Sequence, residues 1–177
     1  MNRSQLEHII RAAAANADAS DVVIIGSQAL LGSYANPASE ILTRSMEADV
    51  FPRDDPERAV LIDGAIGERS LFHETFGYYA HGVGRETAVL PKGWEDRLIP
   101  IRNENTRGCT GWCLEPHDLA VSKLAAGRRK DLDFVGAMFA DKLAEPALVK
   151  DRFETTPFST EEARKLAGQR LAALAKS

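Results

Sequence analysis

The stretch that decides the fold is residues 22–51, which read VVIIGSQALLGSYANPASEILTRSMEADVF. An apolar run at residues 22–25 predicts a buried strand, and this run ends at a glycine-serine pair at residues 26–27. A helix-competent segment at residues 28–34 follows, and a polar loop leads to a second strand candidate at residues 45–51. The stretch therefore predicts two strands that are joined by a short helix and a loop.

Two acids of the second predicted strand, Glu47 and Asp49, are separated by one residue. Because side chains of a strand alternate between its faces, both carboxylates project from one side, while Met46, Ala48 and Val50 face the other. Such a pair is costly to bury unless a cation compensates it, and Mg²⁺ prefers oxygen ligands of this kind. The spacing alone is equally compatible with an edge strand whose outer face carries two acids.

Gly26 and Ser27 favour the metal-site interpretation. A strand that ends in Gly-Ser and opens a helix directs backbone N–H groups and the positive helix end outward, which creates an anion or phosphate site. Glycine lets the backbone approach a ligand, and serine can cap the helix or donate to a phosphate oxygen. An ordinary tight turn would carry the same pair, so the pair gains weight only from the nearby acids.

A second motif lies at residues 118–131, DLAVSKLAAGRRKD. Proline at residue 116 predicts the start of a helix and Gly127 predicts its end. On this helix Lys123 points away from the apolar face that includes Val121 and therefore need not serve the same packing face. The basic run at residues 128–130 would then occupy the turn before a further helix.

Asp131 begins the apolar stripe of that further helix and is expected to point inward near the helix N-terminus. The remaining members of the stripe are Phe134, Val135, Met138 and Phe139. A simpler interpretation is that Asp131 caps the helix and that the basic run is a solvated turn.

Together the motifs resemble the nucleotidyltransferase superfamily that includes DNA polymerase β. Residues 43–49 (TRSMEAD) and the motif at residues 118–131 are similar to the minimal nucleotidyltransferases of the abortive-infection AbiE toxin type. Those proteins pair an R-[TS]-x-D-x-D strand with a downstream K-x-x-A-x-R-x-K-D helix pair. The resemblance covers residues 22–139. The chain departs from the pattern at Glu47, where Asp is commoner, and in a longer loop at residues 27–47.

The resemblance implies an α+β fold, in which a small mixed sheet carries the acids and helices flank it. With 177 residues, of which 44% are hydrophobic, the chain is long enough for one domain with a substantial core. We therefore expect a single nucleotidyltransferase-like domain at residues 1–177. Its sheet-containing catalytic part would cover residues 1–106, and its helical part residues 107–177.

The resemblance also implies a reaction, the transfer of a nucleoside monophosphate from an NTP to an acceptor with Mg²⁺ as cofactor. Glu47 and Asp49 would hold the metal. A third carboxylate usually follows in this superfamily, and Glu74 and Asp96 are the candidates for it.

The remaining roles in this implied site concern the nucleotide. Gly26 and Ser27 would hold the outer phosphates, and Lys123 would neutralise phosphate charge. Asp131 would orient a cation or the nucleotide. Further nucleotide contacts would come from Arg44, Arg128 and Lys130.

The acceptor is left open by the sequence. A net charge of −4 disfavours a protein that coats nucleic acid through a general basic field, so an RNA contact, for example with a tRNA end, would be local to residues 128–130. A protein or small-molecule acceptor is an alternative, as is a catalytically degraded binding module. The resemblance further implies the toxin of a toxin–antitoxin pair, with a cognate antitoxin as partner. Without an apolar run of membrane-spanning length or a signal segment, we expect a cytoplasmic protein.

The cysteines and remaining histidines do not by themselves predict a metal site. Cys109, Cys113 and His117 would need a fourth ligand to hold zinc, and their segment reads as irregular, so reduced loop thiols are the better interpretation. His73 and His81 could contact a base or carry a proton, although histidines among aromatic residues are more often packing residues.

The segments outside the two motifs predict further elements. Residues 4–7 (SQLE) and residues 159–162 (STEE) have the spacing of capping boxes that open helices. Asp55 before Pro56 predicts a helix that runs to about Gly67.

Strands are predicted for much of residues 70–102. Residues 71–79 are rich in aromatic side chains, and residues 87–90 are short and apolar. Residues 97–102 (RLIPIR) carry Pro100, which is typical of an edge strand.

Overall fold

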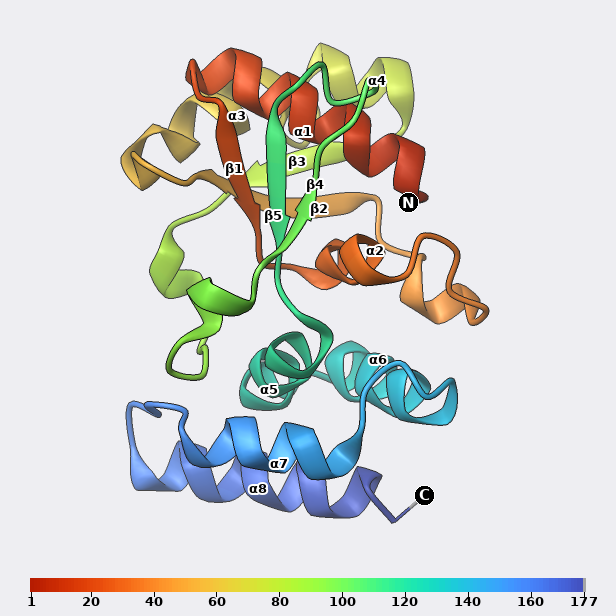
Figure 1. The fold of residues 1–177 in the computed structure, drawn as a ribbon, viewed down its shortest axis with the longest axis vertical. Helices are drawn as coiled ribbons and strands as arrows, with labels where there is room; N and C mark the ends of the chain where they lie inside the picture. Colours follow the sequence, from red (N-terminus) through yellow and green to blue (C-terminus); the bar gives the residue numbers. More distant parts are fainter. Residues whose placement is uncertain (177) are drawn as a thin grey trace.

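The computed structural model describes residues 1–176 and shows one sheet with helices around it (Figure 1). In chain order the elements, with η for short 3-10 helices, are α1 (Arg3–Ala17), β1 (Asp21–Ile24), η1 (Ser27–Ala29), α2 (Leu30–Ser33), η2 (Glu40–Leu42), β2 (Glu47–Pro52), η3 (Pro56–Arg58), α3 (Ala59–Ile66), α4 (Leu71–Phe76), β3 (Tyr79–Gly82), η4 (Arg85–Thr87), η5 (Trp94–Arg97), β4 (Ile99–Ile101), β5 (Thr110–Cys113), α5 (Pro116–Ala126), α6 (Arg129–Ala140), α7 (Pro146–Glu154) and α8 (Glu161–Leu174). This arrangement confirms the predicted α+β fold.

Within residues 1–176 the sheet has five strands in the order β3-β2-β1-β5-β4. β1 runs antiparallel to β2 and parallel to β5, β2 runs parallel to β3, and β4 runs antiparallel to β5. The two strands predicted from residues 22–51 are therefore direct neighbours near the middle of the sheet. β4 lies at an edge, where the missing N–H of Pro100 is tolerated, as the sequence predicts.

Helix α1 covers the sheet together with α3 and α4 (Figure 1). Its capping box joins Asn2 and Gln5, whose side chains each accept from the other's backbone N–H, and so lies two residues before the predicted one. In α8 the N-cap is Thr160, one residue after the predicted cap. The apolar stripe of α1 is buried as predicted: Leu6, Ile9, Ile10, Ala13, Ala14 and Ala17.

Helices α5 to α8 gather beyond the ends of β1 and β5 (Figure 1). α5 begins after Glu115, whose carboxylate accepts from the backbone N–H groups of His117 at 3.0 Å and Asp118 at 3.3 Å. It ends at Gly127, which has a φ of 64° and thus the left-handed conformation that glycine adopts readily. The predicted start and end of this helix are both confirmed.

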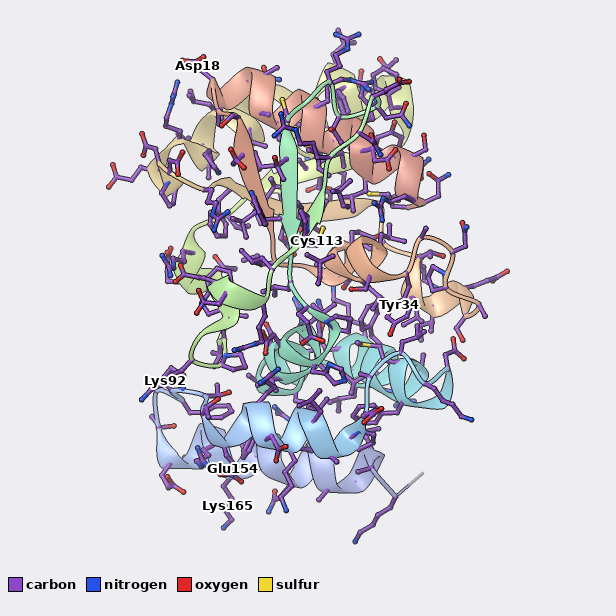
Figure 2. The ribbon with its side chains drawn as sticks, viewed as in Figure 1. Asp18, Tyr34, Lys92, Cys113, Glu154 and Lys165 are labelled. Atoms are coloured by element: carbon purple, nitrogen blue, oxygen red, sulfur yellow. The ribbon has the colours of Figure 1, made fainter. Side chains whose placement is uncertain are left out.

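Side-chain hydrogen bonds tie these helices to the sheet part of the chain. Arg97 in η5 donates from Nε and Nη2 to both oxygens of the fully buried Asp118 in α5, at 2.9 Å and 3.1 Å. Tyr34, which follows α2, donates from its hydroxyl to the carbonyl oxygen of Leu143 at 3.2 Å (Figure 2). These bonds fix where α5 and α6 stand relative to the strands.

The central strand β5 was not predicted, because its segment reads as irregular. Gly111 lies under α1, and a Cβ there would come within 2.3 Å of Ile10 Cδ1, so the glycine marks a close approach within a strand. Cys113 is fully buried at the end of β5 (Figure 2), where burial raises the pKa of its thiol to about 12, so it is not a loop thiol. The sheet thus extends beyond residue 106, and the helical part begins at Pro116.

Residues 71–79 do not form the predicted strand. Residues 71–76 are helix α4, which begins after Ser70, whose hydroxyl accepts from the N–H of His73, and ends at Gly77 with φ of 74°. Its phenylalanines pack against Tyr78 and His8. Only the last residue of the predicted strand belongs to one, β3.

Two further differences concern shorter segments. Residues 87–90 form the end of η4 and irregular chain rather than a strand. Helix α7 begins with Pro146 at its first turn and was not predicted. Among residues 1–176, none of the helices combines the length and the hydropathy that a membrane crossing requires.

Candidate functional site

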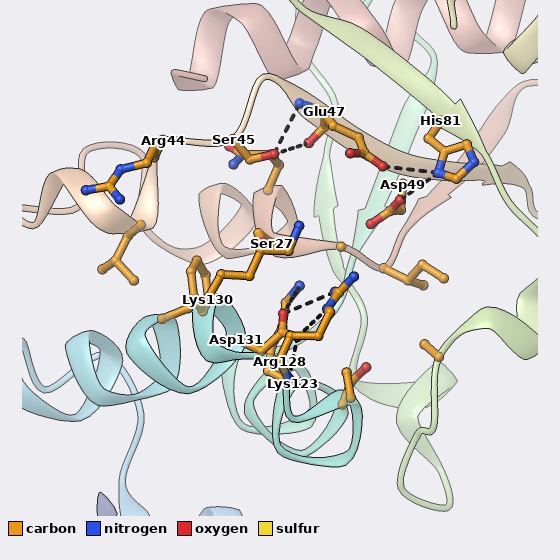
Figure 3. A pocket seen from close by; sticks show the side chains of 18 of the residues that line it. Ser27, Arg44, Ser45, Glu47, Asp49, His81, Lys123, Arg128, Lys130 and Asp131 are labelled. Carbon is orange, nitrogen blue, oxygen red and sulfur yellow. Dashed lines mark hydrogen bonds and ion pairs between the residues drawn. The ribbon is translucent and has the colours of Figure 1, made fainter. Parts of the chain in front are cut away.

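A cavity of about 580 Å³ opens where the strands meet α5 and α6. This volume lies within the usual range for small-molecule sites. Most of the residues that the sequence predicts for the site line it: Gly26, Ser27, Arg44, Glu47, Asp49, Lys123, Arg128, Lys130 and Asp131. Two motifs that are about seventy residues apart in the chain, by the numbering of Asp49 and Lys123, therefore face one another across one cavity (Figure 3).

The acid wall of the cavity is built by β2 and β3. The parallel register places Tyr79 beside Glu47 and His81 beside Asp49, so all four side chains project from the same face of the sheet. His81 Nδ1 lies 3.1 Å from Glu47 Oε1 and 3.3 Å from Asp49 Oδ1. The predicted alternation within the strand is confirmed, except that Met46 precedes the strand and is 54% exposed.

Glu47 is held in place by the phenol of Tyr79, which donates to Glu47 Oε2 at 3.2 Å. Burial and the negative charge of Glu47 raise the pKa of Tyr79 to about 12, so the phenol keeps its proton and remains a donor. One oxygen of the longer glutamate side chain is thereby fixed, and the other faces His81.

The surroundings of Asp49 disfavour the charged form of its carboxylate. Burial raises the pKa of Asp49, the charge of Glu47 raises it further, and the nearby ammonium of Lys123 only partly opposes these effects. The carboxylate also lies close to the backbone of the turn after β1, because a Cβ at Gly26 would lie 2.1 Å from Asp49 Oδ2. Glycine is therefore required at residue 26 for Asp49 to take this position.

The turn after β1 presents Ser27 to the cavity at the start of η1. Next to it, Gln28 is fully buried, and within residues 1–176 neither its Nε2 nor its Oε1 has a hydrogen-bond partner. A buried amide without partners destabilises the fold, so this position is not explained by packing alone.

The opposite wall of the cavity is basic and is organised by Asp131, which is 2% exposed. Asp131 accepts from Arg128 Nε at 2.6 Å and Nη2 at 3.2 Å, and Lys123 Nζ lies 3.4 Å from its Oδ1. Asp131 also accepts at 3.3 Å from the backbone N–H of Arg128, the N-cap residue, so it takes part in capping α6 and binds both cations at once. The capping and functional interpretations of Asp131 are therefore compatible.

Lys123 is buried between α5 and α6, with its ammonium 5.8 Å from the centre of the Phe134 ring. Burial lowers the pKa of Lys123, while the charges of Asp131 and Asp49 oppose that effect. For Asp131, burial would raise the pKa, but the hydrogen bonds of Arg128 and the charge of Lys123 outweigh it and lower the pKa. These residues therefore form one cluster of interacting charges that extends from the basic wall of the cavity to Asp49 on the acid wall.

The basic residues at the cavity mouth are more accessible. Arg44, Arg128 and Lys130 are all exposed, and the side chain of Arg128 is 60% accessible despite its bonds to Asp131. Figure 3 shows Glu47 on one side of the cavity and these cations on the other side or at its edge.

The structure does not bring either candidate for a third carboxylate to the cavity. Glu74 lies on the exposed surface of α4, and Asp96 is exposed in η5. Within residues 1–176, the group that could hold a metal ion is Glu47, Asp49 and His81, with ligand atoms all within 4.8 Å of one another.

The sequence reasoning missed Tyr79 and the placement of His81. Both lie on the same face of β3 in the segment YAHG, which begins two residues after the helix end at Gly77. Assigning Ser70 and Gly77 as helix boundaries would have isolated this short strand, but its pairing with β2 needed the fold.

Comparison with known proteins supports the resemblance to nucleotidyltransferases, without the finer AbiE-type assignment. Searches of curated proteins and of solved structures find no match to the chain. A family model described as a nucleotidyltransferase of unknown function (DUF6036) matches residues 4–171, which include both walls of the cavity. The chain therefore belongs to this family of nucleotidyltransferases.

Proposed function

We propose that this protein is a Mg²⁺-dependent enzyme that moves a nucleoside monophosphate from an NTP to an acceptor hydroxyl or phosphate and releases pyrophosphate. The observation that supports this most strongly is the division of the cavity, with the carboxylates of Glu47 and Asp49 on one wall and the cations Lys123 and Arg128 on the other. A metal-bound triphosphate needs both, oxygen ligands for the metal and positive charge for the phosphates.

The residues present fit a divalent metal ion. Glu47 and Asp49 are a half-buried pair of like charges, and burial together with the charge of Glu47 raises the pKa of Asp49, an effect that a bound cation would compensate. These two residues would hold the ion. When bound, it supplies Lewis-acid polarisation of the phosphoryl oxygens.

The remaining residues of the cavity suit the nucleotide. The Ser27 hydroxyl can donate to a phosphate oxygen, while Lys123 offers a point charge and Arg128 a planar fork of donors. Asp131 keeps both cations at the cavity although each has a long, flexible side chain. Their positions are therefore set before the nucleotide binds, which lowers the entropic cost of binding.

The acceptor that we favour carries a phosphate backbone, for example a tRNA end. Arg44 and Lys130 are exposed at the cavity mouth, where they can contact phosphates outside the nucleotide site. A toxin role with a cognate antitoxin, and action in the cytoplasm, are further proposals that rest on the AbiE resemblance and on the sequence alone.

A second candidate is a nucleotide-binding module that transfers nothing. It is favoured by Glu47 in place of the commoner Asp and by the exposed positions of Glu74 and Asp96 away from the cavity. The two candidates differ in one measurable property, the appearance of a covalent product.

The test is incubation of the protein with Mg²⁺, each α-labelled NTP in turn and bulk tRNA, followed by separation of RNA, protein and small molecules. We expect label on the RNA with wild type and none with Asp49→Asn. Label on a small molecule or on protein would redirect the acceptor assignment. If no label is transferred although the nucleotide binds, the binding-module candidate is correct and the proposed transfer is wrong.

A further inference from the structure

A histidine lies beside the two carboxylates of the acid wall, at the position where a third metal ligand would be placed. His81 Nδ1 lies between Glu47 Oε1, at 3.1 Å, and Asp49 Oδ1, at 3.3 Å. The parallel pairing of β2 with β3 fixes this placement, because Asp49 and His81 are direct partners in the register. Two oxygens from one strand and one nitrogen from its neighbour therefore converge at one point of the cavity.

The ring of His81 is free to serve as a ligand. Its side chain is 50% exposed, and within residues 1–176 its hydrogen-bond and ion-pair partners are these two carboxylates, both through Nδ1. A metal ion at this point would thus replace the contacts of His81 with the acids without breaking another contact of the ring. Glu47 is equally prepared, because Tyr79 holds its Oε2 and leaves Oε1 directed at His81.

The donor set decides which ions suit such a site. Mg²⁺ is a hard cation that prefers oxygen ligands and keeps several waters, whereas an imidazole nitrogen suits first-row transition metals. Three carboxylates at the same point would favour Mg²⁺. Replacing one of them by imidazole shifts the preference toward transition-metal dications.

We propose that His81 completes a mixed nitrogen–oxygen metal site with Glu47 and Asp49, and that this site binds Mn²⁺ and Co²⁺ in preference to Mg²⁺. The proposal rests on the proposed function in assigning a metal to the acid wall. It goes further in naming the third ligand and the class of ion.

The test is calorimetric titration of the nucleotide-free protein with Co²⁺ and, separately, with Mg²⁺. The quantity of interest is the ratio of the two dissociation constants. Wild type is compared with His81→Ala, which removes the nitrogen, and with His81→Asp, which offers a third carboxylate. His73→Ala is the matched control, because His73 packs against Tyr79 with ring centres 4.6 Å apart but does not line the cavity.

We expect wild type to bind Co²⁺ more tightly than Mg²⁺, and His81→Ala to reduce this preference by about tenfold or more. His81→Asp should bind Mg²⁺ more tightly than wild type does, and His73→Ala should retain the wild-type ratio. Circular dichroism of each variant establishes that the sheet has formed.

Two outcomes would overturn the proposal, and they are distinguishable. If His81→Ala weakens Co²⁺ and Mg²⁺ binding by the same factor, or leaves both unchanged, His81 is a counter-ion of the acids and not a ligand, while the proposed transferase stands. If wild type binds neither ion, with or without an NTP, the metal assignment of the acid wall fails, and the proposed function fails with it.

Discussion

Replacing Asp49 by asparagine should make the nucleotide-free protein more stable, although Asp49 lies at the centre of the proposed site. In the folded protein the Asp49 carboxylate is partly removed from water and faces the charge of Glu47, and both effects raise its pKa. Asparagine has nearly the same shape but no charge. The variant therefore relieves a repulsion that the free protein otherwise has to bear.

The size of this repulsion follows from the geometry. The ligand atoms of Glu47, Asp49 and His81 all lie within 4.8 Å of one another. Two unit charges at that distance repel by about 1 kcal/mol in water and by about 3.5 kcal/mol at an effective dielectric constant of about 20. Because the Glu47 side chain is 35% exposed and Lys123 opposes the repulsion, we expect a net gain at the lower end, about 1 kcal/mol. For a chain of this length that gain raises the Tm by about 2–4 °C.

The gain should depend on pH with a defined sign. Since the pKa of Asp49 is raised in the folded state, the folded protein holds the Asp49 proton more tightly than the unfolded chain does. Wild type therefore loses stability as the pH rises through the folded-state pKa. The advantage of Asp49→Asn is full above the folded-state pKa and disappears below the ordinary value of 3.8, where the group is protonated in both states.

The assay is urea and thermal unfolding at neutral and acidic pH, with and without Mg²⁺ and an NTP. At about one hundred times the dissociation constant, the nucleotide should stabilise wild type by about 2.7 kcal/mol, and Asp49→Asn should lose most of this increase. Asp54→Asn is the control, because Asp54 is an exposed acid just after β2 that does not line the cavity. A free Asp49→Asn protein that is less stable than wild type, or one that the nucleotide stabilises equally, would refute the reasoning.

Three further predictions concern the basic wall and the turn after β1. Asp131→Asn should destabilise the free protein by about 3–5 kcal/mol, because it leaves buried Lys123 without its partner. Lys123→Ala should cost less, about 1–2 kcal/mol, because Arg128 still pairs with Asp131, and it should weaken NTP binding. Urea unfolding and nucleotide titration check both variants. If both variants lose much stability while their NTP affinity is unchanged, Lys123 and Asp131 only stabilise the fold and do not bind the nucleotide. Gln28→Leu should stabilise the free protein by about 1–2 kcal/mol in the same unfolding assay, because it removes a buried amide without partners. A destabilised Gln28→Leu would mean that the amide is in fact bonded.

Local patterns predicted the parts of the site in which neighbours in sequence are also neighbours in space. Period-two alternation places Glu47 and Asp49 on one face, and the Pro and Gly boundaries define α5. Asp131 was expected to point inward because it begins an apolar stripe, and it is buried. These features depend on backbone periodicity and capping, which a single sequence expresses directly.

The missed features depend on long-range packing. β5 was missed because it contains Gly111, and only the proximity of Ile10 explains a glycine within a central strand. The aromatic residues of α4 look like a strand, since β-propensity largely reflects packing against neighbours, and the caps at Ser70 and Gly77 outweigh it. The role of His81 arises from the register of β3 on β2, which no pattern within either segment encodes.

The hydrogen bonds between the sheet part and the helical part have a consequence for cooperativity. Neither part holds a complete site: the strands supply the acids, and α5 and α6 supply the cations. A ligand that contacts both walls therefore favours the docked arrangement of the two parts over any arrangement in which they separate. By the same linkage, contacts such as that of Tyr34 with Leu143, or of Arg97 with Asp118, contribute to ligand affinity without touching the ligand. Residues at the contact between the two parts can therefore influence ligand affinity from a distance. Substitutions there can change the affinity while the residues that contact the ligand stay the same.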